Sequence, residues 1–471
     1  MVGHRYGPLR FMPGTDGVLF SGMNAQTNRT AWHRLGATEP LASAAALARE
    51  RYRKDNPRSL KIFNDALQAL PGANTRTVLH YSPFPVAIAR AQGAQIEDAD
   101  GHDYQDFLGE YTAGLYGHRH PVIINAISQA LERGLTLGGP GLKESRLARL
   151  MCDRFKALER LRFCNSGTEA NVLALSSARA FSGRSDILVV DGSYHGGVLS
   201  YAGQSPLNLP FPTHRIRFND ADTAVQKITE LDVQLAAIIV EPMIGAGGCI
   251  PAQPEFLQAL RTASEKTGAL LIFDEVMTSR LGASGLHGRL DICPDLVTFG
   301  KYLGGGLSFG AFGGRADILD RFDPRLPDAW PHAGTFNNNT LSMSAGFAGL
   351  NDVFTAEVSE AFFEYGENFR KRLSASLRAL QLPLHLTGMG SMMAIHFCDQ
   401  SPTAPYPGNS VPPDLYELVH LKMMAAGQFY ARRGMINLSL PMTEPMLGRF
   451  EEALIATLGE CADHIEQSVT D

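Results

Sequence analysis

Residues 269–280 read ALLIFDEVMTSR, and the five-residue apolar run that ends at Phe273 decides the fold. Continuous rather than alternating hydrophobicity is typical of a strand buried on both faces, as in a parallel sheet covered by helices. The stretches DILVVDG (186–192), AAIIVEP (236–242) and LVTFG (296–300) follow the same pattern. Helical stretches such as PEFLQALRTASEKTG (254–268) lie between them. The alternation predicts an α/β fold with a mostly parallel sheet.

The segments on either side of this region differ in composition. LASAAALARERYRK (41–54) has no Gly, Pro or turn residue and predicts a helix, whereas the Pro- and Gly-punctuated residues 71–107 predict a loop followed by a small antiparallel element. After about Gly349, longer amphipathic helices such as 358–380 predict a second α+β lobe. We therefore expect an N-terminal extension (1–58), an N-terminal part of a small domain (59–110), a large domain (111–349) and a C-terminal small domain (350–471).

Composition excludes several classes of protein. With 471 residues, 44% hydrophobic and 19% charged, the chain is too apolar for disorder, and its net charge of −6 without Lys/Arg clusters argues against a nucleic-acid partner. No apolar run approaches the ~18 residues of a membrane span, and the N-terminus lacks a secretory signal pattern. Six cysteines without a C-x-x-C pair argue against a disulfide framework and a zinc site. We expect free thiols and a cytoplasmic location.

Three strand ends carry residues suited to chemistry, because ligands of parallel sheets bind beyond the carboxyl ends of the strands. The first is RFCNSGTEANVL, where Ser166, Gly167 and Thr168 precede a strong helix-forming sequence. A turn of this kind presents free N–H groups and a positive dipole end to an anion, so a phosphate would fit there. Alternatively, Ser166 and Glu169 form only a capping box that stabilises the start of the helix.

The other two ends supply an acid and an amine. Asp274 follows the apolar run of residues 269–273, where a carboxylate needs a cationic or hydrogen-bonding partner. Lys301 follows residues 296–300 and precedes the triple glycine 304–306, which lets the backbone pack tightly around whatever the amine contacts. The alternative for this pair is a buried Lys–Asp salt bridge.

Together the three ends match the needs of pyridoxal 5'-phosphate (PLP). Its aldehyde forms a Schiff base with a lysine, its ring nitrogen requires a carboxylate, and its phosphate needs an anion site. Tyr194 and His195, in DGSYHGG, offer an aromatic cover for the ring, although either could be an ordinary loop residue. The sequence therefore predicts a PLP enzyme.

Seven motifs in order, NSGTEA, DGSYHGG, VEPMIGAGG, DEVMTSR, PDLVTFGKYLGGG, FGAFGG and HAGTFNNN, resemble the class III, fold type I PLP-dependent aminotransferases. The resemblance runs from about Ser59 to the C-terminus. Within the family the chain resembles the branch that contains glutamate-1-semialdehyde aminomutase, and most of all the β-phenylalanine (aromatic β-amino acid) aminotransferases, which share PGANTR and GTFNNN. It implies a seven-stranded, mostly parallel sheet flanked by helices, with a smaller α+β domain formed by both ends of the chain.

The resemblance also implies roles for residues of the site. Lys301 would form the Schiff base, Asp274 would face the pyridinium nitrogen, and the phosphate would lie on Ser166, Gly167 and Thr168. Once the amine is released, Lys301 would also move the proton between substrate and cofactor.

Further implied roles concern the ring and a second subunit. Tyr194 would stack on one ring face and Val276 on the other. Thr335 would reach the phosphate of the neighbouring subunit's cofactor, which implies a homodimer with sites at the interface. Glu241 matches the EP motif of the family, and we expect it to be structural support.

Arginines would select the substrate, since a guanidinium binds a carboxylate through two hydrogen bonds. Arg76 in PGANTR and Arg433 in ARRGMINLSLP match the β-amino acid branch, although each could be a solvated surface charge. We expect transfer of an amino group from a β-amino acid to 2-oxoglutarate or pyruvate. The alternative is intramolecular transfer of the aminomutase type. A nucleotide-binding dehydrogenase is disfavoured, because the glycines near Lys301 lack the G-x-G-x-x-G spacing.

Two segments depart from the pattern of the relatives. The N-terminal extension has no counterpart in them, and DQSPTAPYPGNSVPPD (399–414) is a Pro-rich insertion near the expected substrate contacts. The H-x-H pair of His118 and His120 has no third ligand nearby, so we interpret it as a loop and expect no metal.

Overall fold

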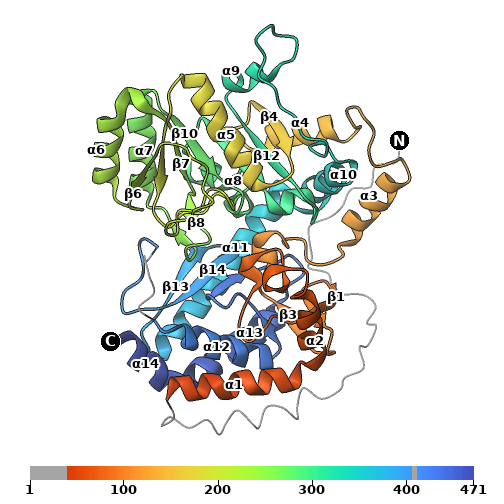
Figure 1. Ribbon diagram of the computed structural model, residues 1–471, viewed down its shortest axis with the longest axis vertical. Coiled ribbons are helices and arrows are strands. Elements are labelled where there is room, and N and C mark those ends of the chain that lie inside the picture. The colour runs from red at the N-terminus through yellow and green to blue at the C-terminus, as the bar shows by residue number, and fades with distance from the viewer. Residues whose placement is uncertain (1–39, 406–410, 471) are drawn as a thin grey trace.

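The computed structural model describes residues 40–405 and 411–470, so residues 1–39 of the N-terminal extension lie outside the described residues. Two lobes meet along the middle of the molecule (Figure 1). The upper lobe contains a seven-stranded sheet, and the lower lobe contains two smaller sheets covered by long helices.

The seven-stranded sheet confirms the predicted α/β fold. Its order is β4-β12-β11-β10-β7-β5-β6, in which β12 is antiparallel to both neighbours and the other pairs are parallel. The four predicted strands are present as β5, β7, β10 and β11. The strands are β4 (Arg160–Cys164), β5 (Asp186–Val190), β6 (Thr213–Ile216), β7 (Leu235–Val240), β10 (Leu270–Asp274), β11 (Leu296–Gly300) and β12 (Gly310–Gly314).

Helices on both faces explain the continuous apolar runs. Leu271 and Phe273 pack in a cluster with residues of α6 (Ala221–Leu231) and α7 (Pro254–Thr267), whereas Leu270 and Ile272 pack with residues of α5 (Gly167–Ser182) on the other face. Since neighbouring positions of a strand point to opposite faces, every position of β10 must be apolar to be buried. Helix α7 begins at Pro254 and ends before Gly268, as predicted from 254–268, and the structure shows that Gly268 adopts a left-handed conformation.

The lower lobe confirms the predicted antiparallel element. Strands β1 (Ile88–Gln92), β2 (Gln95–Asp98) and β3 (Asp103–Asp106) form it, and β15 (Gln428–Phe429) adds to β3 in parallel. A second sheet joins β13 (Leu384–Met389), β14 (Met392–Phe397) and β16 (Met435–Asn437). The surrounding helices are α1 (Leu41–Asp55), α2 (Pro57–Ala66), α11 (Ala356–Ala379), α12 (Pro413–Ala425), α13 (Glu444–Glu460) and α14 (Ala462–Thr470).

The described part of the extension and the Pro-rich loop both pack on the fold. Arg49 of α1 pairs with Asp414 and Glu417 of α12, at 2.5 Å each. The Pro-rich loop reaches the upper lobe, where Asn219 Nδ2 donates to the Thr403 carbonyl at 2.8 Å. The remaining helices of the upper lobe are α3 (Pro121–Leu131), α4 (Glu144–Arg154), α8 (Gly285–Leu290), α9 (Ala316–Leu319) and α10 (Thr340–Ala348), and the two-stranded sheet joins β8 (Met243–Ile244) to β9 (Ile250–Pro251).

None of the described helices is long and apolar enough to cross a membrane. All six cysteines are free thiols.

One titratable group is buried in the lower lobe without a hydrogen bond. The ring of His420 on α12 packs between Tyr81 and Tyr430, with centroid distances of 4.7 and 5.8 Å, and neither ring nitrogen has a partner. Burial lowers the pKa of His420 from 6.5 to about 3, with a further lowering by Arg432. The folded protein therefore holds this side chain neutral.

We predict an acid-dependent loss of stability from His420. Because the unfolded chain binds a proton near pH 6.5 and the folded chain does not, stability is full above that pH and falls as the pH drops towards 3. Between pH 7 and pH 5 the loss is about 2 kcal/mol. Urea unfolding of His420→Phe or His420→Leu at several pH values should give a shallower pH slope than wild type. An unchanged slope in both His420 variants would contradict the prediction.

Candidate functional site

The predicted site residues gather at one edge of the large sheet. Ser166, Tyr194, Glu241, Asp274 and Lys301 follow, or in the case of Asp274 end, strands β4, β5, β7, β10 and β11. These five strands run in the same direction, so their carboxyl ends meet at this edge. The sheet thus places an anion-binding turn, two acids, an aromatic ring and an amine together.

The turn before α5 combines both interpretations of its sequence. Ser166 is the N-cap, and its Oγ accepts from the Glu169 amide at 3.1 Å, while Glu169 accepts from the Asn165 amide at 2.8 Å. Among the described residues, the amides of Gly167 and Thr168 have no hydrogen-bond acceptor. The cap therefore stabilises the helix and still leaves two N–H groups at its positive end for an anion.

Val276 connects this turn to the lysine turn. A Cβ on Gly167 would lie 2.8 Å from both Val276 methyls, and one on Gly300 would lie 3.2 Å from Val276 Cγ1. Both glycines are therefore required for the close approach of three chain segments. The Val276 amide also donates to Asp274 Oδ1 at 3.0 Å, which fixes its position relative to the acid.

Asp274 is buried and held by two polar side chains. Asn171 Nδ2 donates to Asp274 Oδ2 at 2.7 Å, and His195 Nδ1 lies 2.8 Å from the same oxygen. Thr298 Oγ1 donates in turn to Asn171 Oδ1 at 2.6 Å and so orients the amide. Within residues 40–405 and 411–470, no ion pair joins Asp274 to Lys301. The structure thus disfavours the alternative of a buried Lys–Asp salt bridge.

Lys301 has a strained backbone and an altered amine. Its φ of 55° lies in the left-handed region, which an L-residue with a side chain occupies only where the surroundings enforce it. The pKa of the Lys301 amine is lowered from 10.5 to about 8, chiefly by burial and in smaller part by Arg76 and Arg433, against the opposing effect of Asp274 and Glu241. A substantial neutral fraction near pH 7 to 8 suits an amine that acts as a nucleophile and base.

The two rings proposed as aromatic cover have different positions. The side chain of His195 is buried against Asp274, whereas the ring of Tyr194 is 45% exposed.

Glu241 accepts from the amides of Tyr194 at 3.0 Å and Gly245 at 3.1 Å, as expected of a supporting residue. Burial raises the pKa of Glu241 to about 7.

Arg76 and Arg433 come from distant segments and approach the same tyrosine. The Arg433 guanidinium lies over the Tyr111 ring at 5.0 Å, and both arginines act on the pKa of Tyr111. Arg76 forms an ion pair with Glu110. Both cations also lower the pKa of the Lys301 amine.

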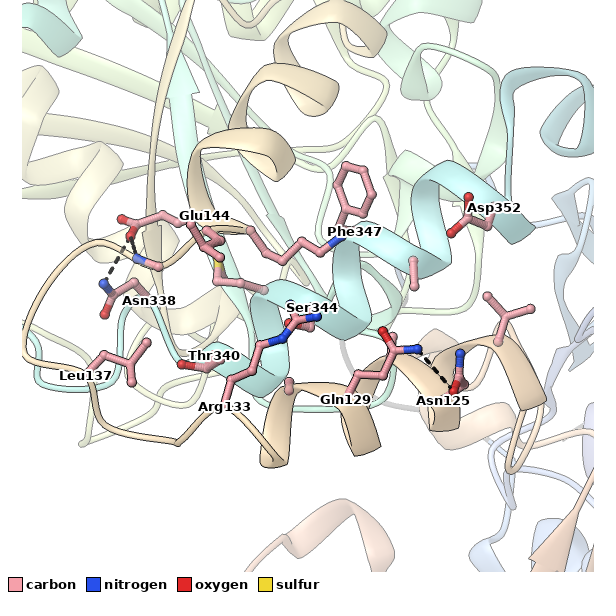
Figure 2. A pocket seen from close by; sticks show the side chains of 18 residues that line it. Asn125, Gln129, Arg133, Leu137, Glu144, Asn338, Thr340, Ser344, Phe347 and Asp352 are labelled. Atoms are coloured by element: carbon pink, nitrogen blue, oxygen red, sulfur yellow. Dashed lines mark hydrogen bonds between the residues drawn. The ribbon is translucent and has the colours of Figure 1, made fainter. Parts of the chain in front are cut away.

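Thr335 lies on the loop before α10. It is exposed, on a loop tied to Asn165 by Asn337 at 2.9 Å. Beside this loop, a cavity of about 210 Å³ opens between α3 and α10, where Asn338 Nδ2 donates to Glu144 at 3.0 Å (Figure 2). None of the predicted site residues lines this cavity.

The sequence analysis did not identify several residues near the site. Asn171 lies inside α5 and Thr298 inside β11. The sequence feature that could have identified them is a polar residue flanked by apolar ones. Arg280 is fully buried in the short helix Thr278–Leu281, and it donates to the carbonyls of Thr112 (3.2 Å) and Leu438 and to Ser391 Oγ (3.1 Å). It thereby joins the two lobes next to the site.

Comparison with known proteins agrees with this geometry. The family model described as aminotransferase class-III matches residues 78–418. The chain belongs to this family. A β-phenylalanine transaminase of Variovorax paradoxus is 47% identical over 420 residues, which cover 89% of this chain and 96% of that protein.

Solved structures give the same picture. A β-phenylalanine aminotransferase from Variovorax paradoxus matches with a TM-score of 0.88 at 46% identity, covering 90% of this chain and 98% of that one. A transaminase with PLP bound matches with a TM-score of 0.80 at 28% identity, covering 88% and 99%.

The pKa of Lys301 gives a direct prediction. In protein freed of cofactor, acetic anhydride labelling of Lys301, followed by peptide mass spectrometry, should be half-maximal near pH 8, because the lowered pKa exposes the neutral amine there. Asp274→Asn should move the midpoint to lower pH, since Asp274 raises the pKa. The exposed Lys61 in the same digest reports reagent access, and a midpoint close to 10.5 for Lys301 would contradict the prediction.

Proposed function

We propose that this chain is a PLP-dependent aminotransferase that moves the amino group of a β-amino acid, such as β-phenylalanine, to 2-oxoglutarate or pyruvate. The single observation that carries the proposal is the amine of lowered pKa at Lys301 on the same sheet edge as the buried Asp274 and the free amides of Gly167 and Thr168. The Variovorax relatives, which are named for β-phenylalanine, support the substrate class.

The residues of the site fit PLP. The N-terminus of α5 would accept a phosphate on Ser166, Gly167 and Thr168, and Asp274 is a buried carboxylate with no Lys or Arg ion-pair partner among the described residues. When bound, PLP supplies an electron sink that makes the substrate C–H bond beside nitrogen acidic. Lys301 would hold the PLP aldehyde, and its amine would then carry the proton that leaves the substrate carbon.

Other side chains position the ring and the substrate. Tyr194 would cover one face of the ring and Val276 the other, while His195 orients Asp274 through its 2.8 Å contact. Asp274 would keep positive charge on the ring nitrogen. Arg76 and Arg433 would bind substrate carboxylates.

The proposal includes an assembly, a domain division and a location. We propose the division into the extension (1–58), a small domain formed by 59–110 with 350–471, and a large domain of 111–349, in cytoplasmic protein. We further propose a homodimer in which Thr335 serves the neighbouring subunit. Exposed apolar side chains near the Thr335 loop support a second copy as the occupant of this face, namely Leu131, Leu135, Leu137, Leu142 and Phe336.

An assay with β-phenylalanine and either oxo acid tests the function. We expect formation of glutamate or alanine, and Lys301→Ala should lower kcat by about a thousandfold or more, because the group that binds PLP and moves the proton is lost. Lys301→Ala should also lose the visible absorbance of lysine-bound PLP. The exposed Lys266→Ala is the matched control and should behave as wild type. Conversion of glutamate-1-semialdehyde alone, with no need of an acceptor, would contradict the proposal and support the aminomutase alternative.

Mixing two inactive variants tests the dimer. Thr335→Asp would place a negative charge beside the partner's phosphate, and Lys301→Ala removes the amine of its own site. In a mixed dimer, one site keeps both native residues, so denaturing and refolding the variants together should restore about a quarter of wild-type activity. Refolding each variant alone should restore none. Absence of recovery in a mixture that sizes as dimers would contradict the placement of Thr335.

A further inference from the structure

Glu110 stands on a strained turn beside the site. Residues Gly109–Thr112 have φ values of 52°, 47°, 51° and 81°, so three consecutive residues with side chains are left-handed. Asp106 Oδ1 accepts the amides of Leu108 and Gly109 at 3.0 Å each, and Arg280 binds the Thr112 carbonyl. Backbone strain of this kind persists only where the surroundings enforce it, and it concentrates at functional sites.

The turn gives the two site arginines different partners. Arg433 lies over the Tyr111 ring at 5.0 Å, its Nη2 is 3.7 Å from Met435 Sδ, and no carboxylate of the described chain forms an ion pair with it. Arg76, in contrast, is paired with Glu110. Arg433 is therefore open to a substrate carboxylate, whereas Arg76 already binds the carboxylate of Glu110.

The pair is weak enough for a substrate to displace it. Both side chains are 46% exposed, and an exposed ion pair is worth about 1 kcal/mol or less. Glu110 and Tyr111 are neighbours in the chain, so the Arg76–Glu110 pair and the Arg433–Tyr111 contact lie on the same turn, where a substrate carboxylate held by Arg433 would compete with Glu110.

We propose that Glu110 is a specificity-determining residue that competes with the substrate for Arg76. A monocarboxylate uses Arg433 without breaking an ion pair. A dicarboxylate that engages both arginines must displace Glu110, so Glu110 disfavours dicarboxylates relative to monocarboxylates. This inference rests on the proposed function, because it assigns Arg76 and Arg433 to substrate binding.

Calorimetry with glutarate, an unreactive dicarboxylate, tests the competition in the PLP-loaded protein. Glu110→Gln should bind glutarate about fivefold more tightly, which corresponds to loss of a competitor worth about 1 kcal/mol. Binding of uncharged glutaramide should not change. The ratio of kcat/KM for 2-oxoglutarate to that for pyruvate should rise by a similar factor, and Glu110→Asp, which keeps the charge, should stay near wild type.

Two further variants separate competition from a general effect of charge. The double variant Arg76→Gln/Glu110→Gln should bind glutarate with the same affinity as the single variant Arg76→Gln, because Glu110 has no arginine left to compete for. Glu97→Gln, which breaks the Arg90–Glu97 pair across β1 and β2, is the matched control and should leave glutarate binding unchanged. Unchanged glutarate affinity in Glu110→Gln, or a gain that persists without Arg76, would overturn the inference. Failure of wild type to transaminate any β-amino acid would instead reject the proposed function, and the binding experiment distinguishes the two.

Discussion

The carboxylate of Asp274, buried at the end of β10, is the constraint on which the site depends. A carboxylate removed from water needs donors, and here they come from α5 (Asn171), from the loop after β5 (His195) and from its own chain (Val276). Satisfying one acid therefore fixes the relative positions of a helix and two loops. The same elements carry the turn before α5 and the ring of Tyr194, so the hydrogen bonds of a single side chain hold together the residues that are proposed to bind PLP.

Sequence patterns were sufficient to predict the strands that are buried on both faces. The apolar runs around Ile238 and Ile272 are buried on both faces, and their hydrophobicity identifies them as strands. Strand β12 was not predicted, because GAFGG (310–314) resembles a turn. The structure explains its composition: a Cβ on Gly310 would lie 2.2 Å from the Ser166 carbonyl oxygen, and one on Gly313 would lie 2.4 Å from that of Arg160. Positions 310 and 313 therefore have no room for a side chain of the kind that favours strands. This restriction comes from the assembled sheet and is not visible in the local sequence.

The site, like the fold, contains residues that the sequence predicts and residues that it does not. Lys301 and Asp274 were predictable, since each lies at the carboxyl end of a strand that the apolar pattern identifies, and the Ser166 turn was predictable because its Ser-Gly-Thr sequence precedes a strong helix-forming stretch. Asn171, Glu110 and Arg280 were not, because their importance comes from contacts across more than 100 residues of chain or from a backbone conformation that composition does not encode. His195 was assigned to the aromatic cover, yet its contact with Asp274 depends on the path of the loop after β5, which no local motif specifies.

Arg280 links the lobes in a way that limits how the molecule moves. Its guanidinium is fully buried, carries no carboxylate partner among the described residues, and is satisfied by Thr112, Ser391 and Leu438. Hinging one lobe away from the other would strip these acceptors from a charge that water cannot reach at once, and such a group is costly to leave unsatisfied. The Arg280 contacts therefore oppose a hinge motion that separates the lobes at this point.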